Sequence, residues 1–296
     1  MSLVSLTKIQ GNRLKEAIWR SLKEIQFEMP SRIRSIMIKP NLCYYWDYST
    51  GQTTDPNFVA AIIDFIREKF SVDAEISIVE SDASAMKCKY AFKMLGYEKL
   101  AKTHHVKLVN LSNEESSPMS VVVRGKNFRF MAPKIICEAD VKINVPKIKY
   151  TMRGIELTCA LKNIYGCNPY PKKFEYHRVL IETIVALNKL MKFDLHVVDG
   201  NIVSGVHPRK LGLVMASKDP VALDTVAAEI AGLNPKKIKY LRLAEKEGLG
   251  KTSYLPKGIP VEYFKSRYPK KDLKKKVIDK AYTFLVFTGL NKKLGI

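Results

Sequence analysis

The chain has 296 residues, with 50 Lys and Arg against 29 Asp and Glu, a formal net charge of +21 at pH 7 and 46% hydrophobic residues. This length allows two domains or one large α/β domain with additions, and it suffices to bury a core without disulfides. The ordinary apolar content excludes a chain that is disordered throughout. No apolar run approaches the ~18 residues that a membrane-spanning helix needs.

Short apolar runs alternate along the chain with longer segments of helical period, which is typical of a βα series. Strands are expected at residues 3–9, 35–38, 75–79, 107–111, 141–145, 195–198 and 211–216, and helices at residues 12–25, 56–69, 90–103, 175–191, 220–231 and 235–247. Two apolar runs at residues 120–123 and 128–131 flank Gly125-Lys126-Asn127, which predicts an inserted hairpin. The sequence therefore predicts an α/β fold with a mixed, largely parallel sheet, helices on both faces and one hairpin.

Residues 1–250 are expected to form this α/β domain, and residues 251–296 a basic C-terminal extension that ends in a helix. The extension holds 12 Lys and Arg and three acidic residues. Apolar side chains of its last helix, residues 277–290, are interspersed with lysines, so we expect the helix to pack on its own domain or on a second copy as a homodimer. Attachment to an anionic membrane surface is the weaker alternative.

The five cysteines are scattered and form no CxxC pair, so the sequence encodes neither a zinc ribbon nor a ferredoxin-type cluster. Four of them, Cys43, Cys137, Cys159 and Cys167, are expected to be small buried apolar residues. The first residues carry no secretory signal pattern, which favours a cytoplasmic protein. Only three glutamines stand against abundant lysine, a composition typical of thermophilic proteins.

Polar clusters follow the ends of five predicted strands. They are Lys39-Pro40-Asn41, Glu80-Ser81-Asp82, Asn144 with Lys147, Asp199-Gly200-Asn201, and Ser217-Lys218-Asp219. The carboxyl ends of parallel strands lie at one edge of a sheet, where ligands bind, so the clusters are predicted to converge on one site. Asp55 and Asp219 each precede a proline at the start of a helix, and helix capping is their alternative role.

Three side chains are predicted to be catalytic: Lys162, His177 and Lys147. A lysine near a buried site either binds an anion or, with a lowered pKa, acts as base or nucleophile. A histidine in the first turn of a helix beside lysines suits proton transfer, although a partly exposed helix residue is its alternative. The predicted substrate-binding residues are Lys39, Asn41, Thr54, Asn144 and Asn163. Oxygen ligands from Asp55, Glu80 and Asp199 would suit a divalent metal.

An ordered set of short motifs resembles the domain of unknown function 362 family. The motifs are Lys39-Pro40-Asn41, Thr53-Thr54-Asp55-Pro56, Gly96-Tyr97, Ile143-Asn144-Val145-Pro146-Lys147, Leu161-Lys162-Asn163 with Gly166, His177, Val198-Asp199-Gly200, and Ser217-Lys218-Asp219-Pro220 with Asp224. The resemblance covers roughly residues 35–250. Many members of that family resemble iron–sulfur proteins through a segment of clustered cysteines. This chain lacks the segment, so no iron–sulfur cluster is expected.

The sequence predicts an enzyme that acts on a small anionic substrate, a carboxylate or phosphate ester, in a cleft lined by Lys, Asn and His at the carboxyl edge of the sheet. The reaction type stays open. The chain has no P-loop, no GxGxxG after the first strand, no HExxH and no GxSxG. The alternative is an RNA-binding protein that uses its basic surface and residues 251–296, where tyrosines and phenylalanine alternate with lysines.

Overall fold

The structure is a computed structural model that describes residues 1–70, 73–151 and 154–270. The predicted homodimer helix at residues 277–290 lies outside the described residues.

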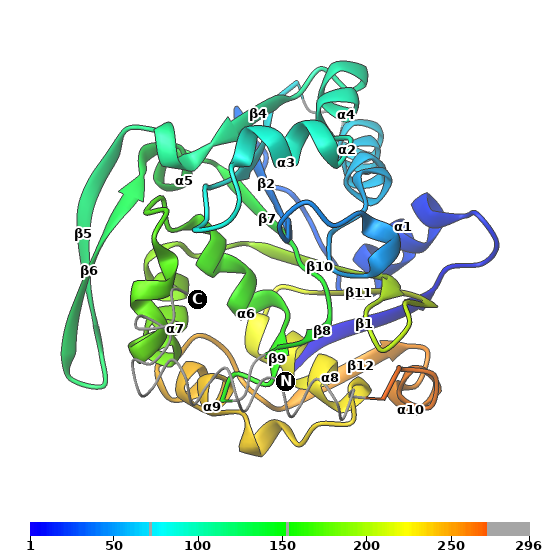
Figure 1. The fold of residues 1–296 in the computed structure, drawn as a ribbon. Helices are drawn as coiled ribbons and strands as arrows, with labels where there is room; N and C mark the ends of the chain where they lie inside the picture. Colours follow the sequence, from blue (N-terminus) through cyan, green and yellow to red (C-terminus); the bar gives the residue numbers. More distant parts are fainter. Residues whose placement is uncertain (71–72, 152–153, 271–296) are drawn as a thin grey trace.

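Within the described residues, an eight-stranded mixed sheet forms the centre of the molecule (Figure 1). In spatial order its strands are β12 (Tyr254–Gly258), β1 (Ser2–Lys8), β11 (Arg209–Ser217), β10 (Leu195–Val203), β7 (Val141–Val145), β2 (Ser35–Pro40), β3 (Glu75–Glu80) and β4 (Lys107–Asn110). The run from β10 to β4 is parallel, whereas β11 is antiparallel to both β10 and β1. The predicted mixed, largely parallel sheet is confirmed.

Helices cover both faces of this sheet. One face carries α1 (Leu14–Glu24), α2 (Pro56–Phe70), α3 (Cys88–Met94) and α4 (Tyr97–Thr103); the other carries α6 (Ala160–Asn163), α7 (Leu180–Leu190), α8 (Pro220–Ile230) and α9 (Lys239–Lys246). Alternate residues of a strand point to opposite faces, so in β2 Ile36 and Ile38 belong to the first core and Met37 to the second. Both cores are dense in Ile, Val and Leu.

Of the predicted helices, one is divided into two helices and two begin as a 3-10 helix. The helix expected at residues 90–103 is two helices, α3 and α4, because Gly96 between them has a φ of 82° that interrupts the helix. The helix expected at residues 175–191 starts as a 3-10 helix, η4 (Lys173–Val179), and becomes α-helical only at α7. The helix expected at residues 235–247 likewise begins with a 3-10 turn, η5 (Pro235–Lys237), before α9.

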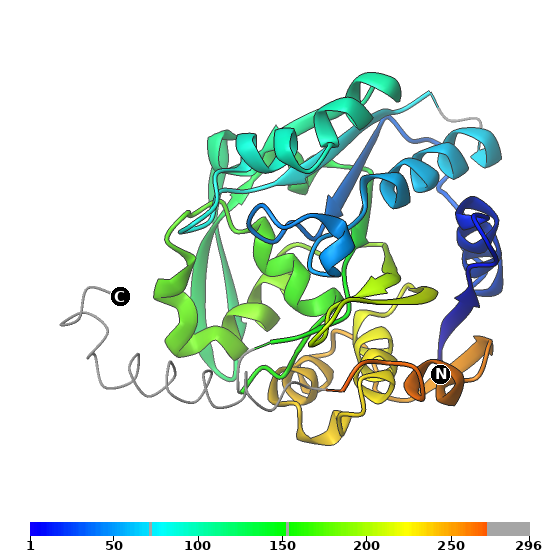
Figure 2. The ribbon, with the colours of Figure 1, turned by 45° about the vertical axis from the view of Figure 1, so that its right-hand side comes forward.

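The predicted hairpin is confirmed and is longer than expected. Its strands β5 (Ser116–Val123) and β6 (Lys126–Pro133) form a separate two-stranded sheet that lies beside α7 (Figure 2). Val123 and Phe130 point into the core, which attaches the hairpin to the α7 side of the molecule. It is followed by α5 (Lys134–Glu138), and a second small sheet pairs β8 (Lys149–Tyr150) with β9 (Leu157–Thr158).

Residues 254–265 are part of the sheet domain. Strand β12 pairs with β1 along its length, and α10 (Val261–Lys265) buries Phe264 in the core. The described part of the predicted extension is therefore integrated with the body of the fold, and the boundary at residue 250 stays a prediction. No helix in the described part of the chain is long and apolar enough to cross a membrane.

Candidate functional site

Four of the five polar clusters lie at one edge of the sheet. Strands β2, β3 and β7 end there, and Lys39 is the register neighbour of Asn144. Strand β10 extends past this edge, where Asp199 forms an isolated bridge with Lys147. Convergence of these four clusters follows from the parallel order of the strands, as the sequence predicted.

The prediction that the fifth cluster, Ser217-Lys218-Asp219, converges with the other four is wrong. This cluster follows β11, which runs antiparallel to β10, so the chain leaves the sheet here in the opposite direction. Asp219 caps α8, because its Oδ1 accepts from the backbone N–H groups of Val221 at 2.8 Å and Ala222 at 3.0 Å. The alternative capping role of Asp219 is thus confirmed.

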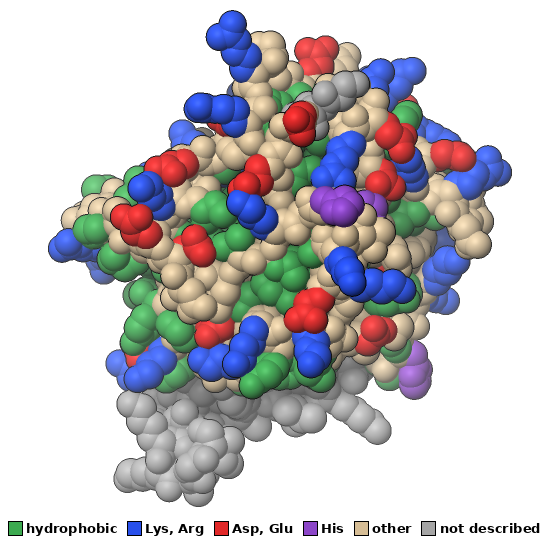
Figure 3. Space-filling model, turned by 90° about the horizontal axis from the view of Figure 1, so that it is seen from above, with side chains coloured by type: hydrophobic (Ala, Val, Ile, Leu, Met, Phe, Trp, Pro, Cys, Tyr) green, Lys and Arg blue, Asp and Glu red, His purple; other side chains and the backbone are tan. Residues whose placement is uncertain are grey.

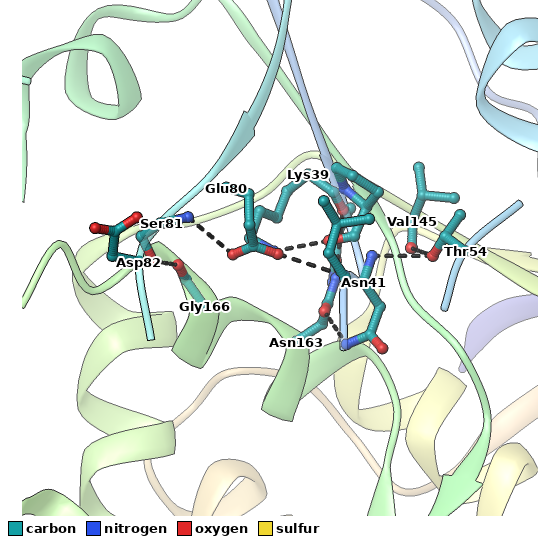
Figure 4. Close-up of polar contacts among 12 residues, drawn as sticks. Lys39, Asn41, Thr54, Glu80, Ser81, Asp82, Val145, Asn163 and Gly166 are labelled. Atoms are coloured by element: carbon teal, nitrogen blue, oxygen red, sulfur yellow. Dashed lines mark hydrogen bonds and ion pairs between the residues drawn. The ribbon is translucent and has the colours of Figure 1, made fainter. Parts of the chain in front are cut away.

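A directed series of side-chain hydrogen bonds, here called the amide chain, runs along this edge, and Figure 4 shows its link between Asn41 and Asn163. Lys149 Nζ donates to Asn41 Oδ1 at 2.8 Å, and Asn41 Nδ2 donates to Asn163 Oδ1 at 2.7 Å. Asn163 Nδ2 donates to Asn144 Oδ1 at 2.7 Å, and Asn144 Nδ2 then meets His196 Nδ1 at 3.0 Å. His196 is buried, and burial lowers its pKa to about 3, so its neutral ring accepts at Nδ1. Asn41, Asn144 and Asn163, predicted separately, are therefore one connected unit.

Thr54 fixes the backbone around the amide chain. Its hydroxyl accepts from the Asn41 backbone N–H at 2.9 Å and donates to the Val145 carbonyl at 2.9 Å. Its own carbonyl accepts from the Tyr97 hydroxyl at 2.9 Å. Thr54 is completely buried, so its contacts hold the segment after β2 against the end of β7.

Two of the predicted lysines are engaged in buried ion pairs. Lys39 Nζ lies 2.8 Å from Glu80 Oε2, and Lys147 Nζ lies 3.0 Å from Asp199 Oδ2. Each lysine also donates to a carbonyl, that of Pro40 for Lys39 and that of Ile202 for Lys147. Their charges are balanced inside the protein, which leaves little net positive potential for a ligand.

The three predicted metal ligands lie beside two different lysines. Glu80 pairs with Lys39, whereas Asp55 and Asp199 lie together beside Lys147, with the Asp55 backbone N–H donating to Asp199 Oδ2 at 3.0 Å. Burial, reinforced by Asp199, raises the pKa of Asp55 against the opposing effect of its hydrogen bond from Asn57. In residues 1–70, 73–151 and 154–270, no three His, Cys, Asp or Glu side chains are grouped so that they could hold a metal ion. Glu80 and Asp199 each have a buried lysine as their ion-pair partner.

A basic cluster, comprising Lys149, Lys162 and His177, lies next to the amide chain. Lys149 is 7% exposed and donates to Asn41 Oδ1 and to the Gln52 carbonyl at 2.7 Å. Burial, followed by the charge of Lys149, lowers the pKa of Lys162 to about 8. Burial and then the charge of Lys162 lower the pKa of His177. The predicted residues Lys162 and His177 are thus near enough for the charge of one to lower the pKa of the other.

Lys162 differs from the other lysines at this edge in the contacts of its ammonium. It is partly buried, and among the described residues its ammonium makes no hydrogen bond or ion pair. Its backbone, in contrast, is firmly held. Asp224 accepts from the N–H groups of Ala160 at 2.6 Å and Leu161 at 3.2 Å, and so fixes the start of α6.

The sequence reasoning missed two buried lysines. Lys149 lies two residues after Lys147, and the alternation of an extended chain was the available signal that both face the same side. Lys173 donates to Ser81 Oγ and, at 2.7 Å, to the Asp82 carbonyl, and burial lowers its pKa to about 8. No local pattern distinguishes it from the adjacent exposed Lys172.

The cysteines are only partly as predicted. Cys159 and Cys167 are buried, but Cys137 is exposed and Cys43 is only partly buried. Cys43 opposes the effect of burial on the pKa of Lys149, so its thiol lies near the basic cluster.

Comparisons with known proteins agree with the family resemblance of the sequence. The family model for the domain of unknown function DUF362 matches residues 36–229, which include every residue of the amide chain and the basic cluster. Thylakoid-associated protein sll1697 of Synechocystis sp. is 33% identical over 133 residues, 39% of this chain. The chain spans 40% of the length of that relative.

Among solved structures, the lactate racemase apoprotein from Thermoanaerobacterium thermosaccharolyticum is similar with a TM-score of 0.45 and 11% identity, over 79% of this chain and 58% of that one. The family match covers well over half of the 296 residues and contains the whole candidate site. The chain therefore belongs to the DUF362 family.

Proposed function

We propose that the protein is an enzyme whose basic cluster binds a small anionic substrate, a carboxylate or a phosphate ester. The observation that carries this proposal is the Lys162 ammonium, which is partly buried beside Lys149 and has no acidic partner in the described part of the chain.

Electrostatics supports an anion as the missing partner. Removing an ammonium from water without a counter-charge is costly, and a second ammonium nearby adds repulsion. Lys39 and Lys147 do not share this problem, because Glu80 and Asp199 neutralise them. A carboxylate or phosphate at Lys162 and Lys149 would relieve both costs at once.

The neighbouring side chains have suitable roles in such a site. The Asn41 amide is oriented by Lys149 on one side and by Asn163 on the other, so it can position a ligand. His177 has a lowered pKa and is therefore neutral near pH 7, where an imidazole can accept a proton and return it. Together they provide charge attraction, orientation and proton transfer.

The RNA-binding alternative stays a prediction. It depends largely on residues 251–296, of which residues 271–296 lie outside the described residues. On the face seen in Figure 3, Lys and Arg side chains are interspersed with Asp and Glu rather than gathered in one patch.

Anion-dependent stabilisation tests the proposal. Sulfate, oxalate and phosphate are added to the wild type, to Lys162→Met and to Lys102→Met, a control at an exposed lysine of α4. A ligand at a hundred times its Kd stabilises the folded state by about 2.7 kcal/mol, which a thermal melt resolves. We expect this stabilisation in the wild type and the control but not in Lys162→Met.

The unfolding temperatures of the variants without anions give an independent test. Lys162→Met removes an ammonium without a counter-charge, so without anions it should unfold at the same temperature as the wild type or higher. Retention of full anion stabilisation by Lys162→Met would overturn the proposed site.

A further inference from the structure

We infer that the Lys162 amine is a nucleophile that forms an imine with the carbonyl carbon of its substrate, which is therefore an anionic carbonyl compound such as a 2-oxo acid or an oxo phosphate ester. This inference rests on the proposed function, because the same basic cluster must hold the anionic group.

The availability of the amine singles out Lys162 among the buried lysines at this edge of the sheet. Lys39 and Lys147 are held in ion pairs, and Lys149 and Lys173 each donate to two neutral oxygens. Lys173 has a pKa near that of Lys162 but is 8% exposed and fully engaged. Lys162 alone among these five combines an unengaged amine with partial exposure to solvent.

The backbone that carries Lys162 is fixed on both sides. The carbonyl of Leu161 accepts from Asn188 Nδ2 at 2.8 Å, and Asn163 is a member of the amide chain. With Asp224 holding the start of α6, the amine is presented from a rigid turn. Such positioning lowers the entropic cost of bringing a nucleophile to a carbonyl carbon.

Burial, followed by the charge of Lys149, makes the amine reactive, and Lys149 remains as a second cation for the substrate. The lowered pKa of about 8 gives Lys162 about 300-fold more free amine at neutral pH than an ordinary lysine. Lys149 donates to Asn41 and Gln52, and as an ammonium it can also attract the carboxylate or phosphate. A free amine beside a cation is an established arrangement for imine formation.

The step balances without an oxidant or reductant. The Lys162 nitrogen forms a bond to the carbonyl carbon, and a proton passes from that nitrogen to the oxygen. The hydroxyl then takes a second proton and leaves as water, so amine, carbonyl and one proton give a protonated imine and water. His177, whose pKa is lowered by burial and then by the Lys162 charge, would carry the proton from nitrogen to oxygen.

Reductive trapping tests this inference on the full chain. Wild-type protein is incubated with pyruvate or with dihydroxyacetone phosphate, sodium borohydride is added to deliver hydride to the imine carbon, and the modified residue is located by peptide mass spectrometry. We expect one dominant adduct on Lys162, far above that on the exposed Lys102, and its loss when sulfate competes. Trapping by only one of the two probes identifies the anionic group.

The variants separate this inference from the function on which it rests. Lys162→Arg keeps the positive charge, so it should keep sulfate stabilisation and lose the adduct. Sulfate binding in the wild type with adducts spread equally over Lys162 and Lys102 overturns imine formation alone. Absence of both sulfate binding and the adduct overturns the proposed function as well. Because the adduct is mapped on the wild type, the result does not depend on the folding of a variant.

Discussion

The Asn41 side chain donates its amide N–H to Asn163 Oδ1 at 2.7 Å, and this contact joins residues 122 positions apart in the sequence. It ties the segment after β2 to α6, and so places the loop that carries Cys43 beside the helix that carries Lys162. Each hydrogen bond of the amide chain points in the same direction, from Lys149, which only donates, to His196, which accepts. Each amide consequently has one favoured orientation.

Removal of the central amide should be costly. Asn163→Ala leaves Asn41 Nδ2 without its acceptor and the buried Asn144 Oδ1 without its donor. Unpaired buried groups cost roughly 1–3 kcal/mol each, so we expect a loss of about 2–4 kcal/mol in the free energy of unfolding, measured with urea. Asn127→Ala, at an exposed position of β6, is the matched control and should cost less than about 0.5 kcal/mol. Equal losses in the two variants would contradict a structural role for the chain.

The Lys147–Asp199 pair predicts a compensating double substitution. Lys147→Met leaves the fully buried Asp199 carboxylate unpaired, with an expected loss of about 3–5 kcal/mol. Adding Asp199→Asn removes that unbalanced charge and should restore part of the stability. Lys265→Met, which breaks an exposed pair with Glu262, serves as control and should cost less than about 1 kcal/mol. A double variant less stable than Lys147→Met would refute the argument.

Much of the fold could be predicted because its signals are local. The apolar run at residues 141–145 is strand β7 with the same bounds, and the turn at Gly125 gives the hairpin between β5 and β6. The η4 segment was misread because its sequence has helical character, whereas the contact of Lys173 with Ser81 that holds it in place spans 92 positions.

The location of the site could be predicted from the sequence, but which lysine pairs with which carboxylate could not. Parallel strand ends bring Lys39, Glu80 and Asn144 to one edge, and parallel order is inferable from the βα pattern. Strand β11 turns back antiparallel to β10 after the short connection at residues 204–208, whereas the βα pattern suggests one more parallel strand, so Ser217 was misplaced. Carboxylates that suggested a metal instead pair with lysines, which a sequence does not specify.

Asp224 predicts a pH-dependent loss of stability. Burial raises its pKa to about 7, against the opposing hydrogen bonds from Ala160 and Leu161. The folded state therefore binds the proton more tightly than the unfolded chain, and this contribution to stability is lost as pH rises from about 4 to about 7. Over that range the free energy of unfolding of the wild type should fall relative to that of Asp224→Asn, measured with urea at successive pH values. A difference between the two proteins that is constant with pH would contradict this expectation.

Anion affinity should weaken at alkaline pH because the Lys162 ammonium loses its proton. The Lys162 ammonium has a pKa of about 8, so it is charged below that pH and neutral above it. Sulfate does not titrate in this range, and its Kd, measured by calorimetry, should be constant from pH 6 to about 7 and then rise by up to about tenfold per pH unit. In Lys162→Arg the guanidinium stays charged, so the Kd should remain flat to higher pH. If the variant weakens in parallel with the wild type, the titrating group is another member of the basic cluster, such as Lys149, whose pKa burial also lowers.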